Sequence, residues 1–149
     1  RPVWTSCRTK SWTARKAIKA AGLSRRVSVR MVGSNGLPVK GPFDLITLVQ
    51  VLHEIRPDMR PTILGECARQ IAPDGWLVIL DETYPSSWAE LRQPENWRPI
   101  VTAYTELTWG NVLPTRQEQE ALLAGAGFVI RERGVVGDGF TLLTAQKAS

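Results

Sequence analysis

Histidine and cysteine are scarce in this chain of 149 residues, which has one histidine and two cysteines. A single histidine excludes a histidine-rich metal site, and Cys7 and Cys67 lie too far apart to match the ligand spacing of a zinc site. A disulfide framework is not expected either, and no signal-peptide pattern is present. The cysteine content therefore favours a reducing compartment, and we predict a cytoplasmic protein without a metal.

Long apolar runs are absent as well. No run reaches the roughly 18 residues that a membrane span needs, so we expect a soluble protein with no membrane partner. The chain is 43% hydrophobic and 22% charged and has six tryptophans, a composition typical of a folded domain with its own core. Because the chain starts at Arg1 rather than at methionine, we expect a fragment of a longer protein or a processed product.

Acidic residues are missing from residues 1–40, which contain ten lysines and arginines. Residues 41–149 carry nine basic and fourteen acidic residues. A basic segment that includes Trp4 and Trp12 is one form of a nucleic-acid-binding surface, but no base-reading motif accompanies it. A solvated basic face also explains the charge. A basic nucleic-acid-binding module therefore stays an alternative, and nucleic acid is not the partner that we expect.

Hydrophobic periodicity predicts alternating helices and strands. Helices are predicted over 12–21, over 61–72 and after Thr115, which forms a capping box with Glu118. Cys67 lies on the inner stripe of the second helix, so we interpret it as a core residue rather than a nucleophile. A turn is predicted at 73–75. Strands are predicted over 27–31, 43–50, 76–81, 128–132 and 139–146.

The order of these elements predicts the fold. The run from 43 to 52 is nearly continuous in apolar residues, which is typical of a central parallel strand covered on both faces. The last two predicted strands form an antiparallel hairpin. We therefore predict an α/β fold with a mostly parallel sheet and one domain over 12–149, after a basic arm over 1–11 without ordered structure. Residues 83–114 are too long for a simple connection and are predicted to be a lid-like insertion.

Several catalytic motifs are also absent. His53 is not followed by the second histidine of a zinc-protease motif, because position 57 is proline. No Walker A loop and no Gly-x-Ser-x-Gly elbow occur. What remains is position. Gln50, Asp81 and Glu82 lie at or near the carboxyl ends of predicted parallel strands, where ligands bind in open α/β sheets.

Three segments resemble class I S-adenosylmethionine-dependent methyltransferases, in the order in which that family has them. Residues 43–55 are similar to the family's fourth strand and the turn after it. Residues 73–79 are similar to the approach to its fifth strand, and 115–128 to its last helix and sixth strand. With the final hairpin, the match covers residues 12–149. The resemblance implies a Rossmann-like, incomplete methyltransferase fold.

The resemblance also implies a function and a site. The function is transfer of a methyl group from S-adenosyl-L-methionine to a small apolar or aromatic molecule, with His53 or Glu54 as a general base. The residues implied for the cofactor are Asn35, Val49, Gln50, Val51 and Leu52. Those implied for the substrate are Tyr84, Trp88, Trp97, Tyr104 and Trp109. The alternative for these aromatic residues is a place in the core or in a dimer contact.

The sequence departs from the family at the cofactor anchors. The family's Gly-rich loop is absent, and residues 1–42 contain no acidic residue that can hold the cofactor ribose. We therefore predict that the chain alone binds S-adenosyl-L-methionine weakly or not at all. A methyltransferase-like remnant or interaction module without cofactor is a further alternative. A homodimer is open too, because the strand over 27–31 lacks its family neighbours and can borrow an edge from another chain.

Overall fold

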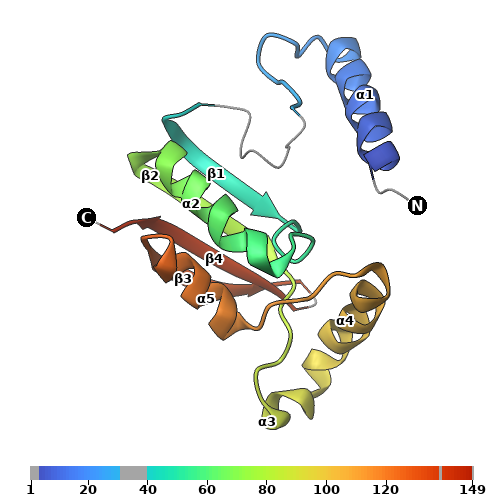
Figure 1. The fold of residues 1–149 in the computed structure, drawn as a ribbon, viewed down its shortest axis with the longest axis vertical. Helices are drawn as coiled ribbons and strands as arrows, with labels where there is room; N and C mark the ends of the chain where they lie inside the picture. The colour runs from blue at the N-terminus through green and yellow to red at the C-terminus, as the bar shows by residue number, and fades with distance from the viewer. Residues whose placement is uncertain (1–3, 31–39, 138, 149) are drawn as a thin grey trace. The chain divides into compact units, whose positions relative to one another are not determined.

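The computed structural model describes residues 4–30, 40–137 and 139–148 of the chain. The chain divides into two compact units, Arg1–Lys40 and Gly41–Ser149. Within the described ranges, helix α1 belongs to the first unit, and the sheet and the remaining helices belong to the second (Figure 1). Among the helices of the described ranges, none combines the length and the hydrophobicity that a membrane span requires.

The helix of the first unit is longer than the sequence pattern predicts. Helix α1 runs over Trp4–Ala20 instead of 12–21, and Gly22 follows it with a left-handed φ of 70°. The strand predicted over 27–31 is wrong for residues 27–30, which have no regular secondary structure, while Met31 lies outside the described residues. An alternating pattern forms a strand only where a neighbour takes up its hydrogen bonds, and no described strand pairs with this segment.

A four-stranded sheet forms the centre of the second unit. Its strands are β1 (Phe43–Val49), β2 (Ile71–Asp81), β3 (Phe128–Val136) and β4 (Phe140–Lys147), in the order β1-β2-β4-β3. β1 and β2 are parallel neighbours, and β3 and β4 form the antiparallel hairpin, as predicted. β2 joins the two halves, because it also pairs with β4 in antiparallel fashion. The predicted α/β, Rossmann-like class is confirmed. The described sheet is mixed instead of mostly parallel, because only β1 and β2 pair in parallel.

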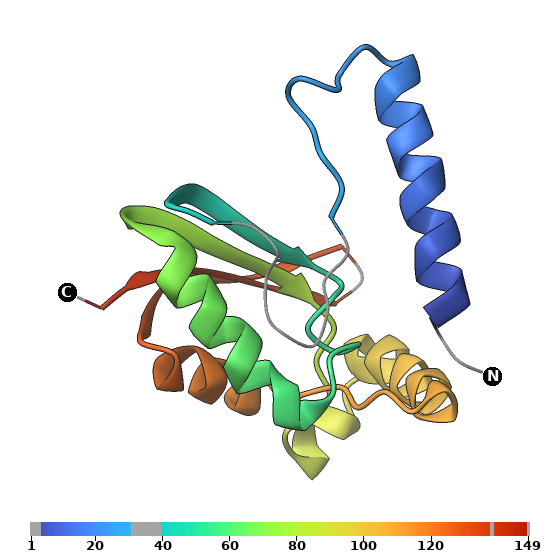
Figure 2. The same ribbon diagram turned by 45° about the horizontal axis from the view of Figure 1, so that its top comes forward.

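The core lies between this sheet and two helices. Helix α2 (Arg60–Gln70) follows the short 3-10 turn η1 (Pro57–Met59), and it lies beside α5 (Arg116–Gly125) on one face of the sheet (Figure 2). The capping box of Thr115 and Glu118 begins α5 as predicted. Cys67 is buried in the core, as expected. The fully buried apolar side chains of this layer include Leu64, Cys67, Leu77, Ile79, Leu123 and Leu143.

β1 differs from the prediction of a central strand covered on both faces. It lies at the edge of the sheet, and Leu45 and Val49 are 56% and 52% exposed. α2 and α5 lie together on one face of the sheet (Figure 2). The continuous apolar run was therefore a correct sign of a strand. It did not identify the strand's neighbours, because hydrophobicity alone does not give strand order.

Two further departures concern connections. Residues 73–75, which predict a turn, lie within β2, where the pairing with β1 shifts register. Gly75 is required there, because a Cβ atom would lie 2.8 Å from the Phe43 carbonyl oxygen. The insertion over 83–114 is mostly helical. It contains α3 (Trp88–Leu91), the 3-10 turn η2 (Pro94–Asn96) and α4 (Trp97–Trp109), which Gly110 ends with a φ of 85°.

Candidate functional site

A tight turn at the carboxyl end of β1 carries the predicted base. We call residues 50–55 the β1 turn. Gln50 begins it with a φ of 51°, a left-handed conformation that is uncommon for a residue other than glycine. Its N–H still donates to the Leu80 carbonyl oxygen at 2.8 Å, so the parallel ladder with β2 continues into the turn. Such outliers persist only where the surroundings hold them, which directs attention to the contacts of this turn.

Asp81 holds the β1 turn from the end of the neighbouring strand. Its side chain is fully buried. One carboxylate oxygen, Oδ2, accepts the backbone N–H groups of Leu52 at 2.7 Å and of His53 at 3.2 Å. The other, Oδ1, accepts the N–H of Glu82 at 2.8 Å and the Nδ1–H of His53. A carboxylate with four donors is well compensated for its burial, so Asp81 is a fixed anion at this edge of the sheet.

His53 is the group that Asp81 orients. With Nδ1–H donated to Asp81, the neutral imidazole keeps its lone pair on Nε2. The hydrogen bond with Asp81 raises the pKa of His53 above its ordinary value of 6.5, against the opposing effect of burial. The negative charges of Glu106 and Glu54 also raise the pKa of His53. The side chain is 7% exposed, so solvent reaches only a small part of the ring.

The other predicted base, Glu54, lies next to His53 in the same turn. Its side chain is exposed and makes no hydrogen bond or ion pair with another described residue. It contributes only its charge to the pKa of His53. Glu106, which was not predicted as a site residue, is 8% exposed and accepts a hydrogen bond of 2.7 Å from Asn111 Nδ2. A lone glutamate on a helix gives no sequence signal of such burial.

The predicted cofactor residues are divided between surface and core. Val49 and Val51 are 52% and 38% exposed, and Gln50 is exposed between them. Leu52 is fully buried, so its side chain supports the turn instead of lining a surface. Asn35 lies outside the described residues. Of the described members, only Val49 and Val51 therefore present exposed apolar side chains at the carboxyl end of β1, where ligands bind in sheets of this kind.

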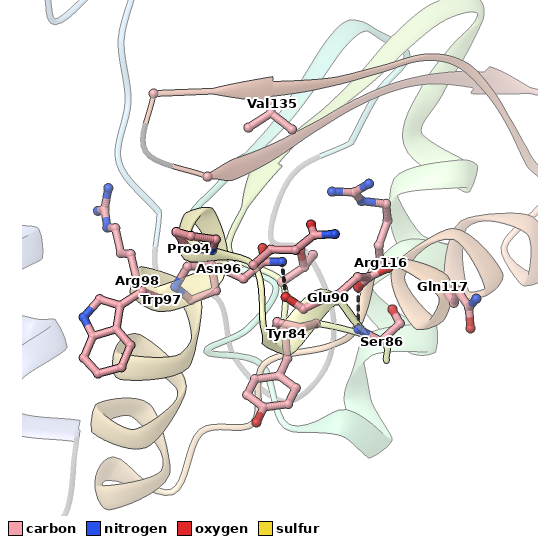
Figure 3. A pocket seen from close by; sticks show the side chains of 16 residues that line it. Tyr84, Ser86, Glu90, Pro94, Asn96, Trp97, Arg98, Arg116, Gln117 and Val135 are labelled. Atoms are coloured by element: carbon pink, nitrogen blue, oxygen red, sulfur yellow. Dashed lines mark hydrogen bonds between the residues drawn. The ribbon is translucent and has the colours of Figure 1, made fainter. Parts of the chain in front are cut away.

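The predicted substrate residues are also divided. Tyr84 and Trp97 line a cavity of about 780 Å³ between the insertion, the start of α5 and the tip of the β3–β4 hairpin (Figure 3). Trp88, Tyr104 and Trp109 do not line it and are 80%, 74% and 71% exposed.

The cavity differs from the surroundings of the base. Two arginines from separate helices, Arg98 and Arg116, lie on opposite sides of it in Figure 3. His53 is not among its lining residues. The cavity and the predicted base therefore occupy different places. Within the described ranges, no group of three or more histidine, cysteine and acidic side chains is arranged to hold a metal ion.

The fold of the chain is similar to that of several solved methyltransferases. No protein-family model matches the chain. Among solved structures, the mitomycin 7-O-methyltransferase MmcR matches with a TM-score of 0.74 and 21% identity, over 93% of this chain and 39% of its own. The N,N-8-amino-8-demethyl-D-riboflavin dimethyltransferase RosA from Streptomyces davawensis matches with a TM-score of 0.71 and 24% identity. This match covers 93% of our chain and 39% of RosA.

A third structure is similar and was solved with ligands. The O-methyltransferase NcsB1 from neocarzinostatin biosynthesis, in complex with S-adenosyl-L-homocysteine and 1,4-dihydroxy-2-naphthoic acid, matches with a TM-score of 0.69 and 21% identity. The match covers 92% of this chain and 39% of NcsB1. The chain thus spans about two fifths of the length of each of these structures. The chain has the fold of the carboxyl-terminal part of class I S-adenosylmethionine-dependent methyltransferases, as the resemblance in its sequence predicted.

Proposed function

We propose that this chain supplies the acceptor side of a methyl-transfer site, with S-adenosyl-L-methionine as the donor and a small hydroxylated aromatic molecule as the acceptor. The observation that carries the proposal is the pair of His53 and Asp81 at the carboxyl edge of β1 and β2. A histidine oriented by a buried carboxylate is a general base in a known arrangement. It stands at the edge of the sheet where this fold binds its ligands.

His53 would act at Nε2. As the acceptor oxygen gains the methyl group, its hydroxyl proton passes to this nitrogen, and Asp81 stabilises the imidazolium that forms. The raised pKa of His53 makes it a stronger base for this transfer. Its burial excludes water, which strengthens the electrostatic interaction with Asp81. Glu54, which is exposed and unpaired among the described residues, is the weaker candidate.

The described residues offer S-adenosyl-L-methionine an apolar contact but no anchor for its ribose. When bound, S-adenosyl-L-methionine supplies an electrophilic methyl group. Val49 and Val51 offer it an exposed apolar wall at the end of β1. Asp81, the carboxylate that contacts this turn, is fully buried and has four donors, so it is not free for the ribose hydroxyls. One wall without a ribose anchor supports weak binding by this chain alone.

A hydroxyl acceptor is favoured over an amine by the chemistry of the base. Removal of a phenolic proton benefits from a base, whereas a neutral amine already offers its lone pair. MmcR is named as an O-methyltransferase, and NcsB1 was solved with a dihydroxynaphthoic acid. The aromatic residues Tyr84, Trp88, Trp97, Tyr104 and Trp109 stay proposed substrate residues. Such rings bind flat molecules by stacking and burial.

Methyl transfer to a panel of aromatic hydroxy acids and aromatic amines tests the proposal. The assay uses the whole chain, radiolabelled S-adenosyl-L-methionine at high concentration, and 1,4-dihydroxy-2-naphthoic acid among the acceptors. We expect transfer that is reduced at least about 100-fold in His53→Gln, the scale of general-base catalysis, and little changed in Glu54→Gln. Loss of activity in Glu54→Gln with activity retained in His53→Gln would assign the base to Glu54. Transfer only to aromatic amines would overturn the hydroxyl acceptor.

A further inference from the structure

Arg60 is buried at the start of α2 although it carries a charge. Its side chain is 4% exposed. Nε donates to the carbonyl oxygens of Leu52 at 3.1 Å and Ile55 at 2.9 Å. Nη2 donates to the carbonyl oxygen of His53 at 3.3 Å and to that of Val112. One guanidinium thus connects three carbonyl groups of the β1 turn with the end of the insertion.

The place of this arginine contradicts the local rules for a helix. A positive charge in the first turn is unfavourable, because the amino end of a helix already carries partial positive charge. The N-cap residue Met59 supplies no side-chain hydrogen bond, and the first turn contains no acidic residue. Within the described ranges, the guanidinium forms no ion pair. Burial lowers its pKa, while the charges of Asp81 and Glu118 oppose that effect. Residues that break local rules in this way are expected at functional places.

Arg60 and Asp81 together satisfy the β1 turn from two sides. The N–H groups of Leu52 and His53 point to the buried anion Asp81. The carbonyl groups of the same two residues point to the buried cation Arg60. The Leu52–His53 peptide therefore lies between two opposite charges, because its N–H donates to Asp81 and its carbonyl oxygen accepts from Arg60. This arrangement determines where the imidazole stands.

We propose that Arg60 is a positioning residue for the base: it fixes the β1 turn so that His53 keeps its hydrogen bond with Asp81, and it joins the insertion to that turn. The proposal deepens the proposed function and rests on it for the role of His53. The contact with Val112 gives it a second consequence. A substrate-covering insertion that is joined to the base turn moves together with the base, so a loosened contact affects both.

The single histidine of the chain makes a direct experiment possible, because its NMR signals need no assignment. The imidazole ¹⁵N shifts and the pKa of His53 are measured in the wild type, Arg60→Met and Arg60→Lys. Backbone hydrogen exchange of Leu52 and His53 is measured in the same samples. Cys67→Ala is the matched control, because Cys67 is a buried residue of the same helix and its side chain forms no hydrogen bond with the described residues of the β1 turn.

In Arg60→Met we expect exchange at both amides to be at least about tenfold faster, since several charge-assisted hydrogen bonds are lost. We also expect the pKa of His53 to fall towards 6.5 and the Nδ1–H tautomer to lose its dominance. The exchange rates and the His53 signals of Arg60→Lys should lie between those of the wild type and Arg60→Met, because an ammonium group donates to fewer of the carbonyls. Cys67→Ala should leave the His53 signals unchanged. If Arg60→Met does not fold, Arg60→Lys decides by the same signals.

Unchanged tautomer, pKa and exchange in the Arg60 variants would overturn the positioning role. An equal change in Cys67→Ala would also overturn it, because the effect would then follow from general destabilisation. These readouts require neither cofactor nor substrate. Failure of the proposed function appears separately, as absence of methyl transfer by the wild type. In the transfer assay, a positioning role predicts that Arg60→Lys lowers kcat by a larger factor than it raises KM.

Discussion

Replacing Asp81 by asparagine removes the negative charge at the centre of the site and leaves a side chain of nearly the same size and shape. The carboxylate accepts four hydrogen bonds, two on each oxygen. An asparagine side chain keeps one acceptor oxygen and places an NH₂ group at the other position. If the oxygen keeps the N–H groups of Leu52 and His53, the NH₂ group faces His53 Nδ1 and the N–H of Glu82. Two donors cannot bond to each other, so this half of the site must rearrange.

The magnitude follows from burial and the number of partners. Asp81 is fully buried, so solvent does not replace the lost interactions. Breaking a buried charged pair by changing one partner costs about 3–5 kcal/mol. We therefore expect Asp81→Asn to lower the free energy of unfolding by roughly 3 kcal/mol or more, out of the roughly 5–15 kcal/mol that is typical of a folded domain. The imidazole should also move its proton to Nε2, which removes the lone pair assigned to the base.

Urea unfolding and histidine NMR measure the two effects. Asp58→Asn is the matched control, because Asp58 is paired with Arg56 at the surface and its side chain is 59% exposed. A surface pair of this kind contributes at most about 1 kcal/mol. A change of less than about 1 kcal/mol in Asp81→Asn, with the pKa and tautomer of His53 unchanged, would refute the assignment of Asp81 as the residue that orients the base.

Four further predictions concern pH, a thiol, a helix cap and a buried amide. Because the folded-state pKa of His53 is raised, its contribution to stability is complete below pH 6.5 and is lost as pH rises through the raised value; urea unfolding at several pH values should show this in the wild type and not in His53→Gln. Burial raises the pKa of Cys67 to about 11, so Ellman's reagent at pH 8 should modify it only at the rate of unfolding, and rapid labelling of its thiol would contradict the placement. Thr115→Ala should lower the free energy of unfolding by about 1 kcal/mol, and an unchanged urea midpoint would argue against the capping box. Neither amide atom of the fully buried Gln119 has a partner among the described residues, so Gln119→Met should leave the melting temperature unchanged or higher.

The sequence predicted the elements whose signals are local. The capping box at Thr115 and the hairpin of β3 and β4 depend on residues close in the chain, and the structure confirms both. The strand over 27–31 failed because a strand depends on a partner elsewhere. The turn at 73–75 failed for a related reason. Proline and glycine mark irregular backbone, and here the irregularity is a change of register within β2.

The candidate site shows the same division. His53 was identified from a resemblance, and Asp81 from its position at the end of a strand. Their hydrogen bond was not predicted, because sequence spacing does not show which side chains meet across neighbouring strands. Arg60 gave no signal at all. In the sequence it is an ordinary arginine next to a proline, just before the predicted helix, and only the folded backbone brings the carbonyl groups of the β1 turn to it.

The burial of Asp81 and Arg60 makes the site insensitive to dissolved ions. At 1 M salt the Debye length is about 3 Å, and exposed pairs such as Arg56 with Asp58 lose most of their attraction. Counterions have little access to the two charges on either side of His53, which are 0% and 4% exposed. The alignment of the imidazole should therefore persist at ionic strengths that weaken the surface of the molecule. Added salt should therefore weaken the surface ion pairs well before it affects the two buried charges that hold the β1 turn.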